Sequence, residues 1–135
     1  MGISVRYLKY EDYDVLCTWW QKWRWNSPPR DFLPQDACGG MMVEIDGVPV
    51  VAGFVYFTNS KVAWIEFIVS NFDYKDKQGR KESIAILIKE LSFLAHKNGS
   101  TYLYTVVKNQ NLKKAYEEAG FSGGSVKVDE MVRVL

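Results

Sequence analysis

The chain has 135 residues, of which 47% are hydrophobic, 15% aromatic and 24% charged. This length predicts one domain spanning residues 1–135, and the apolar content excludes a disordered or low-complexity chain, which lacks enough apolar surface to fold. Its 17 Lys and Arg residues against 16 Asp and Glu give a net charge of +1. Such a balance excludes a global field for holding a polyanion, so we expect no nucleic-acid partner.

The cysteines and the hydrophobic runs of the sequence indicate the cellular compartment of the protein. Cys17 and Cys38 stand alone, with no C-x-x-C motif and no histidine beside them, so we expect neither a metal site nor a disulfide framework. The longest apolar run, 48–57, is too short to span a bilayer, and the N-terminus carries no basic-then-apolar signal sequence. The sequence therefore predicts a cytoplasmic protein with no membrane partner.

The first elements along the chain are a short strand and a helix. Residues 4–8 have the pattern of a strand. Two carboxylates at 11–12 suit the first turn of a helix, which predicts a helix over 11–23. The Asn-Ser-Pro-Pro sequence at 26–29 ends that helix, because proline lacks an N–H and disfavours helix in the residue before it. A loop over 24–36 follows.

Three strands come next. Residues 41–45 and 50–57 flank Asp46-Gly47, and Asp-Gly between apolar runs is a strong hairpin signal. A polar turn then leads to 62–70, whose β-branched and aromatic residues predict a central strand. We therefore expect a three-stranded antiparallel meander over 41–70.

The second half alternates helices and strands. Apolar residues at helical spacing predict a helix over 80–95, namely Ile84, Leu87, Ile88, Leu91 and Leu94. A strand at 102–107, a helix at 111–119 and a final strand at 126–134 follow. Strand-helix-strand crossovers are right-handed, so 62–70 and 102–107 become parallel neighbours. The predicted fold class is α/β (α+β), with a mixed, mostly antiparallel central sheet of about six strands flanked by three to four helices on both faces.

A cluster of cations precedes and opens the long helix. Lys75, Lys77, Arg80 and Lys81 lie where unpaired backbone N–H groups and the helix dipole favour an anion, and phosphate is the natural guest. The alternative is a solvated loop whose own carboxylates offset part of the positive charge.

Several motifs resemble the GNAT superfamily of acyl-CoA N-acyltransferases, over nearly the whole chain. Val5-Arg6 with Asp12 and Leu16 resembles the first strand and helix of that family. Arg80-x-x-Ser83-x-Ala85 resembles its pyrophosphate signature, with Ser83 in place of the first glycine and a longer preceding loop. Asn109, followed by Tyr116-Glu-Glu-Ala-Gly-Phe121, resembles its Asn…Tyr-Glu-x-x-Gly-Phe ending and is the most specific match.

The resemblance implies acetyl-CoA as the co-substrate and no metal. Amides of the pantetheine arm would pair with the backbone of Ile68, Val69 and Ser70, between strands 62–70 and 102–107. The other coenzyme-binding residues that it implies are Lys75, Gly79, Arg80, Lys81, Ser83, Ala85 and Asn109. Asn109 also suits a second role as a helix cap, as Asn often does.

Two side chains are candidates for catalysis by direct attack of an amine on the thioester. Glu66, in an apolar strand, would be the base, since burial raises a carboxyl pKa. Its alternatives are an outward-facing glutamate or one paired with a helix cation. Tyr116 matches the position of the family's acid, which protonates the departing thiolate; its alternative is a packing tyrosine.

A tryptophan-rich segment covers the first predicted helix and the loop after it. The resemblance places Trp20, Trp25 and Arg30 on the acceptor side, although the sequence favours core or interface packing of the tryptophans over specific recognition. The predicted function is therefore N-acetyl transfer from acetyl-CoA to a primary amine. The alternative is a catalytically weak or inactive GNAT-fold binding or structural module that uses the tryptophan surface. The exposed tryptophans and the last strand leave a homodimer open, and nothing in the sequence identifies the amine.

Overall fold

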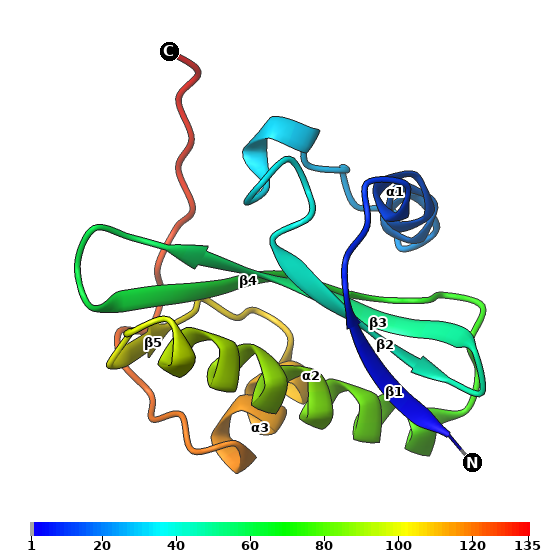
Figure 1. The fold of residues 1–135 in the computed structure, drawn as a ribbon. Helices are drawn as coiled ribbons and strands as arrows, with labels where there is room; N and C mark the ends of the chain where they lie inside the picture. Colours follow the sequence, from blue (N-terminus) through cyan, green and yellow to red (C-terminus); the bar gives the residue numbers. More distant parts are fainter. Residues whose placement is uncertain (1) are drawn as a thin grey trace.

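The fold combines one sheet with three helices, seen in a computed structural model that describes residues 2–135 (Figure 1). The described residues form five strands: β1 (Ile3–Tyr7), β2 (Gly40–Ile45), β3 (Val48–Phe57), β4 (Val62–Ser70) and β5 (Tyr102–Tyr104). Their helices are α1 (Asp12–Lys22), α2 (Lys77–Lys97) and α3 (Gln110–Glu118), with a 3-10 turn, η1 (Arg30–Phe32), after α1.

The strands are ordered β1-β2-β3-β4-β5 across the sheet. Neighbouring strands are antiparallel except β4 and β5, which are parallel and joined through α2. Helix α1 lies on one face of the sheet, and α2 and α3 lie on the other (Figure 1). The predicted fold class, a mixed and mostly antiparallel sheet with helices on both faces, is confirmed.

The β2–β3 hairpin forms where the Asp-Gly signal predicts it. Asp46 and Gly47 have φ values of 51° and 80°, and two successive left-handed residues match the twist of the flanking strands. The turn aligns β2 with β3 in an antiparallel pair, in which Ile45 lies opposite Val48.

Each face of the sheet has its own apolar core. On the α2 side, the helix buries the face that its apolar spacing predicts: Leu87, Ile88 and Leu91 are fully buried, and Ile84 and Leu94 pack against them. On the other side, α1 packs on β2, β3 and β4 through a cluster of Leu16, Trp19, Trp20, Met42, Phe54 and Val69.

Three predictions about the elements are wrong. The described residues form five strands rather than about six, because 126–134 forms no strand: Lys127 has φ = 56°, outside the extended region. Strand β5 ends at Tyr104 rather than at residue 107. Helix α2 begins at Lys77, earlier than 80, because the side chain of Asp76 caps it.

Candidate active site

Strands β4 and β5 separate after three residue pairs. The parallel pairing ends at Trp64 and Tyr104, and the Oγ1 of Thr105 donates a hydrogen bond of 2.7 Å to the carbonyl of Ile65. From Glu66 to Ser70, β4 pairs only with β3 within the described part of the chain. The sequence places the pantetheine residues Ile68, Val69 and Ser70 on this stretch of β4.

A β-bulge changes the direction of β4 just beyond the point where β4 and β5 separate. Phe54 of β3 pairs with Glu66, whereas Ala52 pairs with Val69, so one extra residue is inserted in β4. Phe67, within the bulge, has φ = 58°, which is rare for an aromatic residue and typical of functional sites. Bulges also recur beside active sites, where they redirect side chains.

The bulge fits against a glycine of the neighbouring strand. A Cβ on Gly53 would lie 2.9 Å from Cγ1 of Ile68 and 3.2 Å from Cδ2 of Leu87. These contacts are too close for a larger residue, so glycine at position 53 lets the bulge and α2 pack on the same side of β3.

Glu66 is a half-buried carboxylate without an ion-pair partner among residues 2–135. The indole Nε1 of Trp64 donates to its Oε2 at 3.0 Å. Burial raises the pKa of Glu66, and the hydrogen bonds from Trp64 and from the Phe67 backbone counter this in part. The charge of Glu130 raises that pKa further and Lys108 lowers it. The result is a carboxylate with a raised pKa, as a general base requires.

Tyr116 of α3 places its hydroxyl beside the point of strand separation. The residue is 3% exposed, and its ring packs edge-on against Phe121 with centroids 4.9 Å apart. Its hydroxyl lies 3.5 Å from the Oγ1 of Thr105. Burial raises the pKa of Tyr116, and the nearby charge of Glu66 raises it further, so the phenol stays protonated at neutral pH.

Tyr56 is a site residue that sequence reasoning missed. It pairs with Trp64 across β3 and β4, and its hydroxyl donates to the carbonyl of Phe32 at 2.9 Å. Burial raises the pKa of Tyr56 to about 12, with a contribution from Glu66. The charge of Glu66 therefore raises the pKa of two tyrosines, Tyr56 in the sheet and Tyr116 in α3. The signal for Tyr56 lies in the β3–β4 register, which places it opposite Trp64 and which no local pattern reveals.

The N-terminus of α2 carries an anion of its own. Oδ1 of Asp76 accepts hydrogen bonds from the amides of Gln78 at 3.1 Å and Gly79 at 3.2 Å. The amide of Arg80 already bonds to the carbonyl of Asp76. The carboxylate of Asp76 therefore occupies the amides that a diphosphate at this helix end would use.

The pyrophosphate signature lies inside α2 rather than before it. Arg80 ends the first turn of the helix, and Ser83 and Ala85 follow it, so the backbone N–H groups of Ser83 and Ala85 belong to the helix. Ser83 is fully buried, and its Oγ has no hydrogen-bond partner within residues 2–135.

Arg80 is a cation held by carbonyl groups instead of by a carboxylate. Its Nη2 donates to the backbone carbonyls of Asn71, at 3.2 Å, and Tyr74, and its guanidinium lies 5.6 Å from the ring of Trp23. None of the ion pairs among the described residues includes Arg80, and its Nε is buried without a partner. Its positive charge is therefore not neutralised by the chain. Lys75 lies over the ring of Phe72, at 4.3 Å from the ring centroid.

Trp23, which follows α1, contacts the end of β4. Its Nε1 donates to the carbonyl of Ser70 at 2.8 Å, and its ring packs on Trp25 and on Phe72. The carbonyl of Ser70 was predicted to face the pantetheine arm, so in this structure Trp23 takes one of the backbone groups of that predicted site.

The three residues predicted on the acceptor side have separate environments. Trp20 is 2% exposed and belongs to the core under α1, whereas Trp25 is 50% exposed. The guanidinium of Arg30 lies 3.8 Å from the ring centroid of Tyr10 and 4.4 Å from that of Tyr13. Only Trp25 among them presents a broad exposed surface. Its exposure leaves it open to a ligand or partner, whereas burial of Trp20 restricts that residue to packing.

Asn109 is the N-cap of α3. Its Oδ1 accepts a hydrogen bond of 3.0 Å from the amide of Leu112, which is the capping role anticipated from the sequence. This contact fixes the start of the helix that carries Tyr116.

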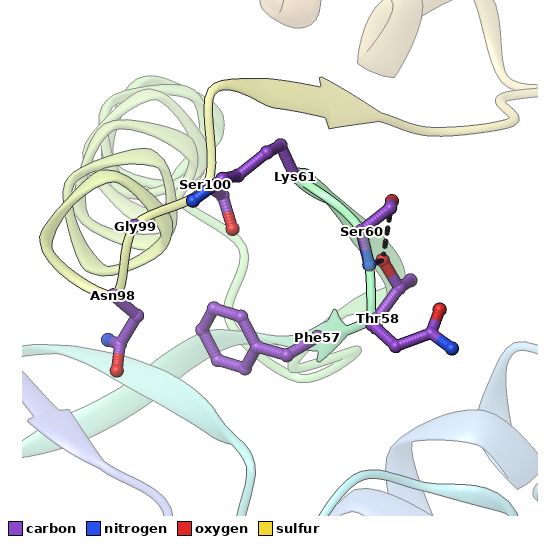
Figure 2. Close-up of a pocket in the computed structure, with 8 residues that line it drawn as sticks. Phe57, Thr58, Ser60, Lys61, Asn98, Gly99 and Ser100 are labelled. Atoms are coloured by element: carbon purple, nitrogen blue, oxygen red, sulfur yellow. Dashed lines mark hydrogen bonds between the residues drawn. The ribbon is translucent and has the colours of Figure 1, made fainter.

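A cavity of about 690 Å³ lies elsewhere on the molecule (Figure 2). It is bounded by the β3–β4 turn at 57–61 and by the 98–100 segment after α2, and no predicted site residue lines it. Within residues 2–135 there is no cluster of three or more His, Cys, Asp or Glu side chains suited to a metal ion. None of the described helices is long and apolar enough to cross a membrane.

Comparison with known proteins gives no sequence match but a clear structural one. No protein-family model and no curated protein sequence matches the chain. Among solved structures, it is similar to glucosamine-6-phosphate N-acetyltransferase from Arabidopsis thaliana (TM-score 0.68, 15% identity, covering 98% of this chain and 100% of that one). It is also similar to ribosomal-protein-alanine N-acetyltransferase from Brucella melitensis (TM-score 0.67, 17% identity, 98% and 99% covered).

A third similar structure contains coenzyme A. N-acetylglutamate synthase from Neisseria gonorrhoeae, complexed with coenzyme A and N-acetyl-glutamate, matches with a TM-score of 0.71 and 15% identity. The match covers 93% of this chain and 29% of that longer one. Together these likenesses establish the architecture: the chain has the fold of the GNAT superfamily.

Proposed function

We propose that the protein is an N-acetyltransferase that transfers an acetyl group from acetyl-CoA to a primary amine by direct attack. The observation that carries this proposal is the arrangement around the β4–β5 separation. There, Glu66, whose pKa burial raises, lies near enough to Tyr116 for its charge to raise the pKa of that tyrosine, next to a β-bulge in β4. The N-acetyltransferases that share the fold support the class of reaction.

In this proposal the two side chains handle the protons of the reaction. Glu66 removes a proton from the acceptor ammonium, directly or through a water, so that the free amine attacks the thioester carbonyl that acetyl-CoA supplies. A backbone N–H near Val69, after the bulge, stabilises the oxyanion. Tyr116 gives its proton to the departing thiolate, and Thr105 holds the tyrosine hydroxyl in place.

In this proposal the groups that bind the coenzyme lie on the edge of β4 and at the N-terminus of α2. The strand edge from Glu66 has free backbone groups for an extended arm, and Arg80 has a charge without an anionic partner. Lys75, Lys81 and the amide of Gly79 lie at the same helix end. The carboxylate of Asp76 competes with a diphosphate for those amides, so coenzyme binding requires it to leave them.

The same capping contact favours a second candidate function. If the helix end stays closed by Asp76 and the carbonyl of Ser70 stays bonded to Trp23, the domain keeps its fold without binding coenzyme. It would then act as a binding or structural module, with Trp25 as its most exposed tryptophan. Coenzyme binding separates the two functions.

Calorimetry with coenzyme A tests the binding step. We expect micromolar binding that is lost in Arg80→Glu and retained in Lys89→Glu, which makes the same charge change on an exposed position of the same helix. No binding to the wild-type chain at saturating coenzyme would favour the module.

Thiol release from acetyl-CoA, measured across a panel of amines, tests the chemical step. We expect Glu66→Gln and Tyr116→Phe each to lower kcat by about 10²-fold or more, as loss of a general base or acid does. Tyr102→Phe, which removes an exposed phenol from β5, is the matched control and should keep its rate. An unchanged rate in Tyr116→Phe would remove that residue from the acid role.

A further inference from the structure

Aromatic side chains lie beside the carboxylate of Glu66 on the sheet. Trp64, two residues before it on the same strand, donates its indole N–H to Oε2 at 3.0 Å. Tyr56 of β3 lies opposite Trp64, and residues opposite one another in an antiparallel pair share a face. The ring of Tyr104, on β5, packs on that of Trp64 with centroids 4.3 Å apart. A row of aromatic residues therefore crosses three strands next to Glu66.

The bulge in β4 adds a further ring to the same face. Consecutive residues of a regular strand point to opposite faces. Glu66 lies opposite Phe54, which belongs to the core between α1 and the sheet, and Phe67 packs against that same core. The inserted residue and the φ of 58° at Phe67 thus bring two consecutive side chains onto one face. The bulge places an aromatic ring next to the carboxylate, where a regular strand would direct it to the other side.

Phe32 extends this aromatic surface beyond the sheet. It belongs to η1, and its ring meets that of Phe67 edge-on, with centroids 5.7 Å apart and an interplanar angle of 77°. Its carbonyl accepts the bond of 2.9 Å from the Tyr56 hydroxyl, which ties η1 to β3. Phe32 is 44% exposed, so part of its ring is open to a ligand. We call these four residues the aromatic cluster: Phe32, Tyr56, Trp64 and Phe67.

The charge beside the aromatic cluster is that of one carboxylate. Glu66 has no ion-pair partner within residues 2–135, and the two other charges that act on its pKa, those of Glu130 and Lys108, have opposite signs. Arg30, two residues before Phe32, stacks on two tyrosine rings and donates to backbone carbonyls. A single carboxylate beside aromatic rings suits an organic ammonium, because the carboxylate pairs with the charge and the ring faces attract the cation.

We propose that the acceptor is a primary amine carried on an aryl or other apolar group, of the class of the arylalkylamines. Its ammonium pairs with Glu66, and its apolar group packs on Phe32 and Phe67. A sugar amine would lay hydroxyl groups against these rings, where they lose their bonds to water without gaining partners.

This inference rests on the proposed function, since it names the amine that Glu66 deprotonates. The new C–N bond forms and the thioester C–S bond breaks. The ammonium loses one proton to Glu66, and its nitrogen loses a second as the amide forms. That second proton replaces the one that Tyr116 gives to the thiolate. Phe32 and Phe67 take no part in these transfers and act on the choice of amine alone.

Acceptor preference, measured as kcat/KM from thiol release, tests the inference. Phenethylamine, ethanolamine and putrescine present the same primary amine on an aryl, a hydroxyl and a cationic end. We expect kcat/KM for phenethylamine to exceed those for the other two by about tenfold or more, because only its ring removes apolar surface from water. A preference for ethanolamine or putrescine would overturn the inference and leave the proposed transfer standing.

Phe32→Ala tests whether the exposed ring makes this preference. We expect KM for phenethylamine to rise by about tenfold, while kcat and the KM for ethanolamine change little. Phe32→Leu keeps an apolar side chain and should restore most of the affinity. Phe93→Ala removes a ring that is 64% exposed from α2, on the other face of the sheet, and is the matched control. Equal losses for both amines in Phe32→Ala would overturn the role of Phe32.

Binding without turnover separates this inference from the proposed function. The NMR signal of the Trp64 indole N–H, identified by its loss in Trp64→Phe, reports on Glu66 directly. We expect phenethylamine to shift this signal at concentrations about tenfold below those that ethanolamine requires. Such a shift with no thiol release from any amine would refute the transfer reaction and support the amine site. Thiol release without a shift or a preference for phenethylamine would refute the amine site, and the absence of both would refute the two together.

Discussion

The indole N–H of Trp64 donates a hydrogen bond of 3.0 Å to the carboxylate of Glu66, two residues further along the same strand. Residues two apart share a face of a strand, so the sheet itself holds donor and acceptor together. The bond stabilises the ionised form of Glu66 and opposes the effect of burial, which raises its pKa. Trp64 therefore tunes the residue that we propose as the base.

Replacing Trp64 with phenylalanine should shift the pH dependence of the reaction. Trp64→Phe removes the bond that lowers the pKa of Glu66, so that pKa rises further. Because the base acts when ionised, the acidic limb of the kcat/KM profile should move to higher pH. Tyr104→Phe, which keeps the ring that packs on Trp64, should leave the limb in place. A shift to lower pH in Trp64→Phe would contradict this assignment.

Thr105 is expected to act through Tyr116 rather than on the substrate. Thr105→Val removes the Oγ1 that lies 3.5 Å from the tyrosine hydroxyl and also leaves the carbonyl of Ile65 without this donor. We expect kcat to fall with little change in KM for the acceptor, since only the position of the acid changes. Thr105→Ser keeps the hydroxyl and should restore most of kcat. Equal losses in the valine and serine variants would indicate a packing role only.

Removing the carboxylate of Asp76 from the N-terminus of α2 should improve binding of coenzyme A. Asp76→Ser keeps a good helix cap but takes away the carboxylate that bonds to the amides of Gln78 and Gly79. Calorimetry should show binding tightened by about threefold to tenfold, within the roughly 0.3–2 kcal/mol that a charge at a helix N-terminus contributes. Asp73→Ser removes a charge from the same loop without uncapping the helix. A larger gain from Asp73→Ser than from Asp76→Ser would contradict this explanation.

The bulge in β4 should depend on the glycine beside it. In Gly53→Ala, the new Cβ would meet Ile68 at 2.9 Å and Leu87 at 3.2 Å, so the strand or helix α2 must shift. We expect a loss of about 1–3 kcal/mol in the free energy of unfolding, measured by urea titration, as overpacking of a core usually gives. Gly123→Ala, in open space, should change that free energy little.

The parts of the fold that follow local patterns could be predicted from the sequence. Leu87, Ile88 and Leu91 recur at helical spacing and are fully buried. Asp46-Gly47 forms the hairpin turn with both residues at positive φ. In each case neighbouring residues alone determine the structure, so no knowledge of distant contacts was needed.

The parts that depend on distant contacts could not be predicted. The bulge at Phe67 exists because β4 must fit both the β3 register and the α2 contact at Gly53. In the alternative to an anion site, the carboxylates of this loop only offset its charge, whereas the carboxylate of Asp76 caps α2, which begins at Lys77. Trp20 of α1 was predicted on the acceptor side, whereas its side chain is 2% exposed in the core between α1 and the sheet.

Acid should destabilise the protein in part through Asp12. Its carboxylate accepts bonds from Nη1 of Arg6 at 2.7 Å, from Nη2 at 3.0 Å and from the amide of Lys9 at 2.7 Å. Burial alone would raise the pKa of Asp12, but these hydrogen bonds lower it below its ordinary value of 3.8. The carboxylate therefore stabilises the fold fully above the pKa that it has in the unfolded chain, and this contribution is lost as pH falls through the lower, folded value.

Asp12→Asn should cost about 3 kcal/mol at neutral pH, since it leaves Arg6 partly buried without this partner. Urea titrations at pH 7 and below pH 3.8 should show the wild type approaching the variant at the lower pH, and an equal difference at both would refute the ion-pair explanation.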